Sequence, residues 1–474
     1  MTLDKQQVLC FALFLVSCCP MKLDDLKLYN FRRFKALDIN FHPELTVLVA
    51  KNGQGKTTVL DAATIVLGTF VGAFDLGKSK PIAQQDARYQ RRLGQSDSEQ
   101  VFPVRLEAAL SMLREPVIRE LNSAKGKTTI KGAVELTSRG KALMEQVRAL
   151  EPVALPLLAY YGSGRLWNAH KNMSRKAVLS ESRTMAYEDC FSAASSFTQV
   201  QQWMTKATFA ALQQKSMEAY QGYKISDQIQ GIQRTIDSVL GAEGWSGFHY
   251  SMQHEELAMS HPEVGVLPVS MLSDGVRAMV SMVADMGWRC AKLNPQMGEA
   301  AAQETEGIVF IDEIDMHLHP QWQQRVIGSL REAFPKVQLI VTTHSPQVLS
   351  TVNADNIRLI RHAYDPETGD TCSEAITPSL QSRGVASNAL LAELQGVDPI
   401  PAVQEASWVK AYMALITSSR QDEGLEVEKQ ALREKILAHF GAHHQVWLEC
   451  QRQERLQQMK SRFGRGAAIG VSGD

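Results

Sequence analysis

The stretch Ala50–Thr58 reads A-K-N-G-Q-G-K-T-T, and it directly follows the apolar, strand-forming run Leu45–Val49. Glycines at Gly53 and Gly55 allow the backbone to turn its N–H groups inward around an anion. The next residues, Val59–Leu67, are suited to a helix whose N-terminal dipole would add to that anion site. A strand, a glycine-rich loop and a helix in this order predict a phosphate-binding loop for a nucleoside triphosphate.

Two side chains of the loop have specific tasks in such a site. The Lys56 ammonium reaches the β- and γ-phosphates, and the Thr57 hydroxyl is a ligand for Mg²⁺. ATP and Mg²⁺ are therefore the predicted cofactors. The loop residues predicted to bind the nucleotide are Asn52, Gly53, Gln54, Gly55, Lys56, Thr57 and Thr58.

Two later strands end in groups that such chemistry needs. Gly307–Asp315 reads G-I-V-F-I-D-E-I-D, which places Asp312 to hold Mg²⁺ as a Walker-B carboxylate and Glu313 to act as general base for the attacking water. Val337–His344 reads V-Q-L-I-V-T-T-H. His344 would face the crevice at the carboxyl ends of an open α/β sheet, where ligands bind.

The segment Met271–Arg277, M-L-S-D-G-V-R, precedes the helical stretch Ala278–Cys290. A Leu-Ser-x-Gly sequence before a helix offers a hydroxyl and backbone amides to an anion. Together with the phosphate loop, the acidic strand and the histidine, it resembles the signature motif of ABC-type ATPases. The combination is similar to the branch that contains RecF, the SMC head domains and the OLD-type nucleases. This resemblance implies an α/β fold, namely an ABC-ATPase head-like P-loop fold.

Within that branch the chain resembles the PtuA-like ATPases of Septu and retron anti-phage defence systems. The resemblance covers about residues 21–400, and it rests on Leu28–Phe34 (L-Y-N-F-R-R-F), Leu155–Trp167 (L-P-L-L-A-Y-Y-G-S-G-R-L-W), Asp312–Pro320 (D-E-I-D-M-H-L-H-P) and Arg383–Leu394 (R-G-V-A-S-N-A-L-L-A-E-L). It implies a head-to-head homodimer with ATP sandwiched between subunits, and a higher oligomer built from it.

In such a dimer, Lys56 and Thr57 would bind ATP in one subunit while Ser273 and Gly275 of the other close over the γ-phosphate. Asp315 would lie in the loop that crosses the dimer interface, and His344 would sense the γ-phosphate. The resemblance also makes Arg32 or Arg33 a candidate phosphate contact. The glutamine that contacts Mg²⁺ in relatives is not identifiable in the sequence; the candidates are Gln84, Gln85 and Gln100.

The composition is that of a large globular protein without a basic bias. The chain has 474 residues, 44% of them hydrophobic, with 51 acidic residues against 50 Lys and Arg. DNA is therefore a candidate partner only through a local patch. Two clusters of basic residues are candidates, although such clusters are more typical of solvated surface: Lys171, Arg175 and Lys176; and Lys78, Lys80, Arg88, Arg91 and Arg92.

Seven scattered cysteines and an ATP site favour reduced thiols and a cytoplasmic location. The apolar run Val8–Cys19 has signal-peptide length but a poor positive flank, and it is too short to span a membrane. The sequence from Met21 onward resembles the usual start of the family. We therefore expect no membrane association, and a fold that begins at Met21.

The predicted organisation follows the order of the motifs. The divisions are 1–20 as a misassigned start or dispensable extension, 21–110 as the N-terminal ATPase lobe, 111–266 as a largely helical insertion, 267–398 as the C-terminal ATPase lobe, and 399–474 as a helical segment for oligomerisation or partner docking. Within the insertion, Glu115–Val147 is interpreted as a polar excursion. Apolar residues every four positions from Trp322 to Phe334 predict one helix.

Alternative chemistries have weaker support. His317 and His319, and the group His439, His443, His444 and Cys450, lack convincing zinc-ligand spacing. Neither a Toprim context nor an HNH motif is evident, so any nuclease would be a separate chain, by resemblance an HNH-type PtuB-like partner. The sequence thus predicts an ATPase, of unspecified turnover rate, that controls such a nuclease. The alternatives are a RecF-like DNA-repair ATPase without a nuclease and an ATP-binding structural scaffold with little turnover.

Overall fold

The computed structural model describes residues 20–91, 98–164, 182–192, 197–215, 224–365, 370–418 and 423–466. It divides into a large unit, Met1–Gln395, and a small unit, Gly396–Asp474. The apolar run Val8–Cys19 and the cluster Lys171, Arg175 and Lys176 lie outside the described residues. None of the helices in the described ranges combines the length and the hydropathy needed to cross a bilayer.

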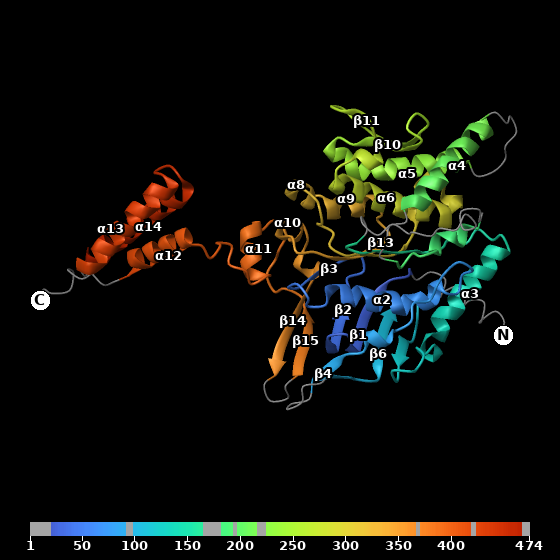
Figure 1. Ribbon diagram of the computed structural model, residues 1–474, viewed down its shortest axis with the longest axis horizontal. Helices are drawn as coiled ribbons and strands as arrows, with labels where there is room; N and C mark the ends of the chain where they lie inside the picture. The colour runs from blue at the N-terminus through green and yellow to red at the C-terminus, as the bar shows by residue number, and fades with distance from the viewer. Residues whose placement is uncertain are drawn as a thin grey trace, which may run out of the picture. The chain divides into compact units, whose positions relative to one another are not determined.

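A six-stranded sheet forms the centre of the large unit (Figure 1). Its strand order is β15 (Asp370–Ile376), β14 (Ile357–Asp365), β3 (Leu45–Val49), β13 (Val337–Thr342), β12 (Gly307–Ile311) and β8 (Leu157–Tyr161). All neighbours are parallel except β14 and β15, which form an antiparallel hairpin. β3, β13, β12 and β8 are buried along their whole length, and their sequences are largely apolar. The buried polar residues Thr46 in β3, and Gln338 and Thr342 in β13, are exceptions.

The order of these strands brings the predicted motifs together. β13 lies between β3 and β12, and all three run in the same direction. Their carboxyl ends therefore meet at one edge of the sheet, which is where the phosphate loop, the acidic pair and the histidine begin. The strands and their order confirm the predicted α/β fold.

A second sheet and two helices complete this side of the large unit. The sheet has the order β2 (Phe34–Asn40), β1 (Leu23–Phe31), β6 (Val104–Leu110) and β7 (Val117–Leu121), with antiparallel neighbours. Helix α2 (Lys56–Val71) is buried almost all round and packs on α3 (Val134–Arg148). Gly140 permits this packing, because a Cβ there would lie 2.9 Å from the Phe70 carbonyl oxygen of α2.

The range 111–266 is divided differently from the prediction. The alternating sequence of β7 buries every second residue and adds a strand to the second sheet, so 115–147 is not merely a polar excursion. β8 belongs to the central sheet. The remainder contains α4 (Phe197–Lys215) and α5 (Ile225–Leu240), but also a sheet of β9 (Ser246–Ser251), β10 (Glu256–His261) and β11 (Gly265–Pro268).

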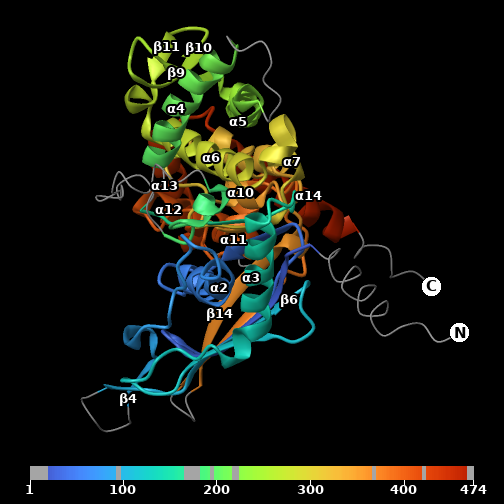
Figure 2. The same ribbon diagram turned by 90° about the vertical axis from the view of Figure 1, so that its right-hand side faces the viewer.

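The elements gather at two ends of the large unit. Figure 2 shows α4, α5 and β9–β11 together at one end, with α2, α3 and β6 at the other. Helix α6 (Asp274–Leu293) is tied to the central sheet by a buried cluster in which Tyr161 Oη donates to Asp285 Oδ2 at 2.7 Å and Arg289 Nε donates to the same oxygen at 2.8 Å. This cluster fixes the helix that begins at the predicted signature motif.

The helix predicted from Trp322 to Phe334 is interrupted. The structure has α8 (Pro320–Gln323) and α9 (Val326–Ala333), and the Arg325 N–H donates to the Trp322 carbonyl, three residues back, at 2.9 Å. The apolar residues at four-residue spacing are all buried, as the pattern indicates. The four-residue spacing of apolar residues thus predicted the buried face correctly, but it did not predict the break between α8 and α9.

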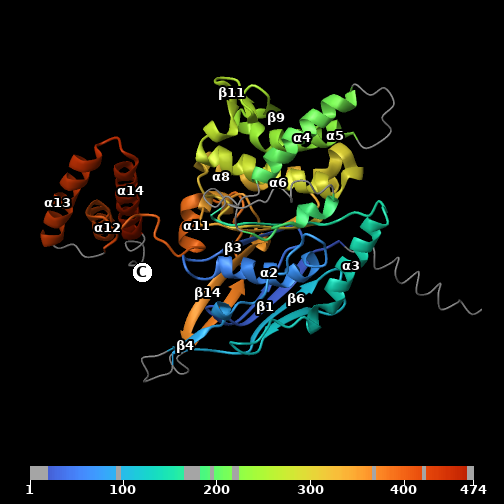
Figure 3. The same cartoon turned by 45° about the vertical axis from the view of Figure 1, so that its right-hand side comes forward.

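The small unit is a bundle of α12 (Gln404–Thr417), α13 (Glu423–Phe440) and α14 (Gln445–Gly466), which Figure 3 shows packed together. Its core is separate from that of the large unit, and its buried members are Tyr412, Ile416, Ile436, Trp447 and Cys450. The core is small, so its largest side chain should contribute a large share of the stability of this unit.

We expect Trp447→Ala to unfold the small unit while leaving the large unit folded. Trp447 is 1% exposed, and removing such a side chain costs about 3–5 kcal/mol. Limited proteolysis with mass spectrometry should show new cuts confined to residues after Gln395. The neighbouring Leu448→Ala is the control, because Leu448 is 50% exposed. Equal protease resistance of both variants would contradict the proposed role of Trp447.

Candidate nucleotide site

The phosphate loop has the left-handed turns that its glycines were predicted to supply. Gly53 has φ 72° and Gly55 has φ 97°, and α2 begins directly after them at Lys56. Lys56 is only 7% exposed. Its Nζ donates to the Ala50 carbonyl at 3.1 Å and lies 2.5 Å from Nε2 of His344. The structure therefore brings the loop lysine and the predicted γ-phosphate sensor into direct contact.

The electrostatics of this pair are consistent with a charged lysine beside a neutral histidine. Burial lowers the pKa of Lys56, while the carboxylates of Asp312, Glu313 and Asp315 act in the opposite direction. Burial, and then the Lys56 charge, lower the pKa of His344. A neutral His344 ring can accept a hydrogen bond from the Lys56 ammonium, which leaves the remaining ammonium protons for a phosphate.

Asp312 connects the phosphate loop to the neighbouring strands. Its Oδ2 accepts a hydrogen bond from Thr57 Oγ1 at 2.8 Å, and its Oδ1 accepts one from Thr342 Oγ1 at 2.6 Å. Its backbone N–H donates to the Tyr161 carbonyl at 2.8 Å. Thr57 and Asp312 thus present adjacent oxygen donors, which is the ligand chemistry that Mg²⁺ prefers.

Glu313 occupies an unusual backbone conformation next to this acid. Its φ is 49°, a left-handed value that residues other than glycine rarely adopt. This conformation costs about 1–2 kcal/mol. The Glu313 N–H donates to Thr342 Oγ1 at 2.8 Å, so the same hydroxyl holds both acids. The Glu313 side chain is half-buried.

Several residues that position the site were not singled out from the sequence. Thr342 was one of them, although the T-T-H sequence at the end of β13 was a usable signal. Thr343 Oγ1 donates to Asp315 Oδ1 at 2.5 Å, and Gln395 Nε2 donates to the His344 carbonyl at 2.9 Å. No local pattern marks Gln395, which lies far along the chain.

The signature segment lies at the start of α6. Ser273 is exposed and is the N-cap residue, and its side chain makes no capping hydrogen bond. Gly275 is buried, and a Cβ there would come 2.4 Å from the His317 carbonyl oxygen. The signature therefore packs on the loop that follows Asp315, but none of its described hydrogen bonds reaches Lys56 or Asp312 of the same chain.

The two candidate arginines differ in their surroundings. Arg32 forms ion pairs with Asp61 at 2.7 Å and Asp86 at 2.8 Å. Its guanidinium charge is therefore already paired with two carboxylates. Arg33 is exposed and donates to the Gly53 carbonyl of the phosphate loop. Arg33 is therefore the better placed of the two.

The candidate glutamines are not brought to the acids by any described hydrogen bond. Gln84 and Gln100 bond to each other, with Gln100 Nε2 donating to the Gln84 carbonyl at 2.9 Å, and Gln85 is exposed. The glutamine that would contact Mg²⁺ stays unassigned.

The second basic cluster is largely neutralised. Lys78 pairs with Asp189 at 3.1 Å and Lys80 pairs with Asp61 at 2.9 Å. Arg88 is 8% exposed, and Arg92 lies outside the described residues. The described side chains of Lys78, Lys80 and Arg88 therefore offer little free positive charge to DNA.

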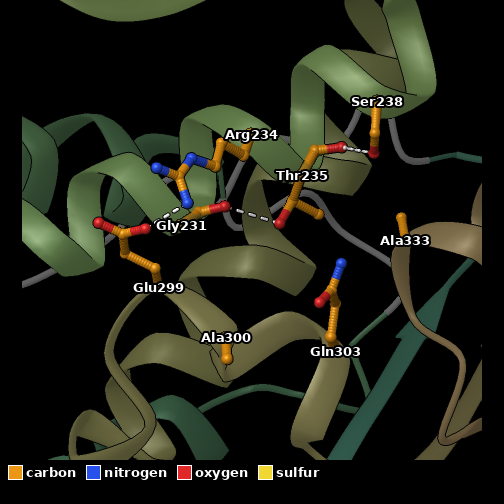
Figure 4. A pocket seen from close by; sticks show the side chains of 8 residues that line it. All are labelled: Gly231, Arg234, Thr235, Ser238, Glu299, Ala300, Gln303 and Ala333. Atoms are coloured by element: carbon orange, nitrogen blue, oxygen red, sulfur yellow. Dashed lines mark hydrogen bonds and ion pairs between the residues drawn. The ribbon is translucent and has the colours of Figure 1, made fainter.

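Other candidate ligand sites are separate from the motifs. A cavity of about 390 Å³, shown in Figure 4, is lined by Gly231, Arg234, Thr235, Ser238, Glu299, Ala300, Gln303 and Ala333. None of these residues belongs to the predicted nucleotide site. In the described ranges no group of three or more His, Cys, Asp or Glu side chains could hold a metal ion. Cys450 is buried in the core of the small unit.

Comparison with known proteins finds similarity to ATPase domains in both halves of the large unit. Residues 25–240 match a family described as an AAA domain, and residues 259–350 match one described as an AAA domain, putative AbiEii toxin, Type IV TA system. The Retron Vc95 probable ATPase of Vibrio cholerae serotype O1 biovar El Tor is 22% identical over 458 residues, which cover 86% of each chain. The chain is thus similar to AAA-type P-loop ATPases over most of its length.

Other known proteins match this chain over shorter segments. The Retron Ec83 probable ATPase of Escherichia coli is 45% identical over 96 residues, covering 20% of this chain and 17% of the relative. The Septu protein PtuA of Bacillus thuringiensis is 48% identical over 52 residues, covering 11% and 13%. A solved SMC head bound to the C-terminal winged-helix domain of ScpA is 14% identical, with a TM-score of 0.44, and covers 76% of this chain and 98% of that one.

We expect Thr342→Val to lower ATP turnover by about 10- to 100-fold, because it removes hydrogen bonds to a carboxylate and to the Glu313 amide. Phosphate release at saturating ATP measures this. Thr46→Val is the matched control: Thr46 is a fully buried threonine of β3 whose hydroxyl accepts from the His42 amide. Equal turnover of the two variants would show that Thr342 does not hold the acids in their active arrangement.

Proposed function

We propose that this chain is the ATP-binding and ATP-hydrolysing subunit of an anti-phage defence complex, in which it controls a separate HNH-type, PtuB-like nuclease. The observation that supports the ATPase part is the meeting of Lys56, Thr57, Asp312 and His344 at adjacent strand ends, joined by direct hydrogen bonds. The coverage of 86% of the retron ATPase from Vibrio cholerae supports the defence part.

Each residue has a distinct role in the proposed reaction. Lys56 and the amides of the phosphate loop bind the β- and γ-phosphates, and Thr57 and Asp312 would hold Mg²⁺. The metal ion, when bound, neutralises charge on the phosphates. Glu313 orients a water molecule toward the γ-phosphate or accepts its proton. His344, already in contact with Lys56, senses whether the γ-phosphate is present.

The exposed signature segment supports a homodimer in the proposed function. Ser273 is exposed at the start of α6, and its side chain makes no capping hydrogen bond. None of its described contacts reaches Lys56 of the same chain. We propose that Ser273 and Gly275 close over ATP bound by a second copy, with Asp315 near the same interface. Nucleotide occupancy would then change the geometry of the subunits.

The remaining parts of the proposal concern the assembly. The bundle of residues 396–474 is a separate unit, which suits it to oligomerisation or to docking the nuclease. DNA is a further candidate partner, and the cytoplasm, where ATP is available, is the proposed location. Lys78 and Lys80 do not support a DNA contact, since both are paired with acids.

Glu313→Gln should keep ATP binding, trap the dimer and abolish turnover. The amide retains the shape of the side chain but cannot accept the proton of the attacking water. Phosphate release and light scattering with Mg²⁺-ATP measure both effects. Glu332→Gln, an exposed glutamate of α9, is the control. Unchanged turnover in Glu313→Gln would remove Glu313 from the mechanism, and absent turnover in wild type would favour a structural scaffold.

Co-expression with the neighbouring genes tests the defence assignment. We expect the chain to co-purify with an HNH-type nuclease in an oligomer larger than a dimer, as measured by light scattering and mass spectrometry. A chain that only dimerises with ATP, and that brings no nuclease with it, would instead support the RecF-like repair function.

A further inference from the structure

We infer that His362 of the β14–β15 hairpin is a positioning residue that holds the phosphate loop in its nucleotide-binding form. This inference rests on the proposed ATP-binding function and extends it to a strand that carries no nucleotide-binding motif. His362 lies more than 300 residues after the loop in the sequence, since its bond to Gln54 spans 308 positions.

The strand register explains how the two segments meet. β14 runs parallel to β3, and Leu359 lies opposite Val49, the last residue of β3. β14 continues to Asp365, so it extends beside the loop that leaves β3. Three residues past Leu359, a rise of about 10 Å, the strand reaches His362. The β14 strand of the hairpin therefore lies beside the phosphate loop.

The ring of His362 bridges the loop and the second strand of the hairpin. Its Nε2 lies 2.9 Å from the Gln54 carbonyl oxygen, and its Nδ1 lies 2.7 Å from Oγ of Ser373, its cross-strand partner. A carbonyl can only accept, so Nε2 carries the hydrogen, and in a neutral ring Nδ1 accepts from the Ser373 hydroxyl. Burial, together with the nearby Arg33 charge, lowers the pKa of His362, which favours this neutral form.

Two neighbours hold the adjacent loop residues. The Phe34 ring stacks on the His362 ring at a centroid distance of 5.7 Å and an interplanar angle of 23°. The same Phe34 ring fills the space beside Gly55, where a Cβ would come within 2.5 Å of it. Arg33 donates to the Gly53 carbonyl. Gly53, Gln54 and Gly55 are thus each contacted from outside the loop.

These contacts act on the conformation of the loop, not on the reacting atoms. A phosphate-binding loop gains affinity when its amides already point inward before the ligand arrives, because less ordering is required on binding. None of the described hydrogen bonds of His362 reaches Lys56, Thr57, Asp312 or Glu313. Loss of the His362 bond should therefore weaken ATP binding and leave the rate at saturating ATP nearly unchanged.

The test uses His362→Phe in the full-length chain, which keeps a ring to stack on Phe34 but removes the bond to Gln54. We expect the Kd and KM for ATP to rise about three- to tenfold, with kcat within about twofold of wild type. His362→Gln, whose amide can donate to the same carbonyl, should restore part of the affinity. Ser373→Ala is a milder variant that should weaken binding in the same direction.

The matched control is His249→Phe. His249 also bonds through a ring nitrogen to a backbone carbonyl, that of Gly247 at 2.7 Å, but it lies in β9. It should leave ATP binding unchanged. Wild-type affinity in His362→Phe, or a fall in kcat at constant KM, would overturn the inference.

Hydrogen exchange without nucleotide separates this inference from the proposed function. The amides of residues 51–55 should exchange faster in His362→Phe than in wild type and His249→Phe, whether or not ATP binds. Unchanged exchange would overturn the role of His362. Failure of the wild-type chain to bind ATP, together with faster exchange in His362→Phe, would overturn the proposed function and leave the role of His362 standing.

Discussion

The hydrogen bonds of the Asp312 carboxylate are the constraint on which the rest of the site depends. One oxygen accepts from Thr57 at the start of α2 and the other from Thr342 at the end of β13, while the Asp312 amide bonds to β8. Asp312, which directly follows β12, thereby joins α2, β13 and β8 at one residue. A carboxylate buried to 2% exposure is costly unless its oxygens are bonded, so these contacts stabilise the folded protein.

The charges around Asp312 match those that the proposed binding of ATP and Mg²⁺ requires. Asp312, Glu313 and Asp315 lie near one ammonium, that of Lys56. The carboxylates of Asp312, Glu313 and Asp315 attract cations, whereas Lys56 and the amides of the phosphate loop attract an anion. Mg²⁺ with ATP supplies both kinds of charge. Without ligands, Thr57 bonds to Asp312 and Lys56 bonds to His344. Mg²⁺ and ATP would replace these two hydrogen bonds.

The parts of the structure that the sequence predicted well are those where one physical requirement determines the residues. β3, β12 and β13 are largely apolar because they are buried on both faces, and the functional groups follow at their carboxyl ends. β7 was missed because a short alternating strand has a weaker signal than its polar surroundings. The break between α8 and α9 was missed because the buried face continues across it.

The residues that the sequence did not identify mostly bond to backbone groups. Thr342 accepts from the Glu313 amide, Gln395 donates to the His344 carbonyl, and His362 bonds to the Gln54 carbonyl. Every residue has these backbone groups, so such contacts leave no pattern at the partner position. A motif therefore reports the side chains that would touch the ligand, whereas the residues that hold the motif in shape are set by strand register. The phosphate loop is recognisable from nine residues, but its conformation also depends on the β1–β2 turn and on β14.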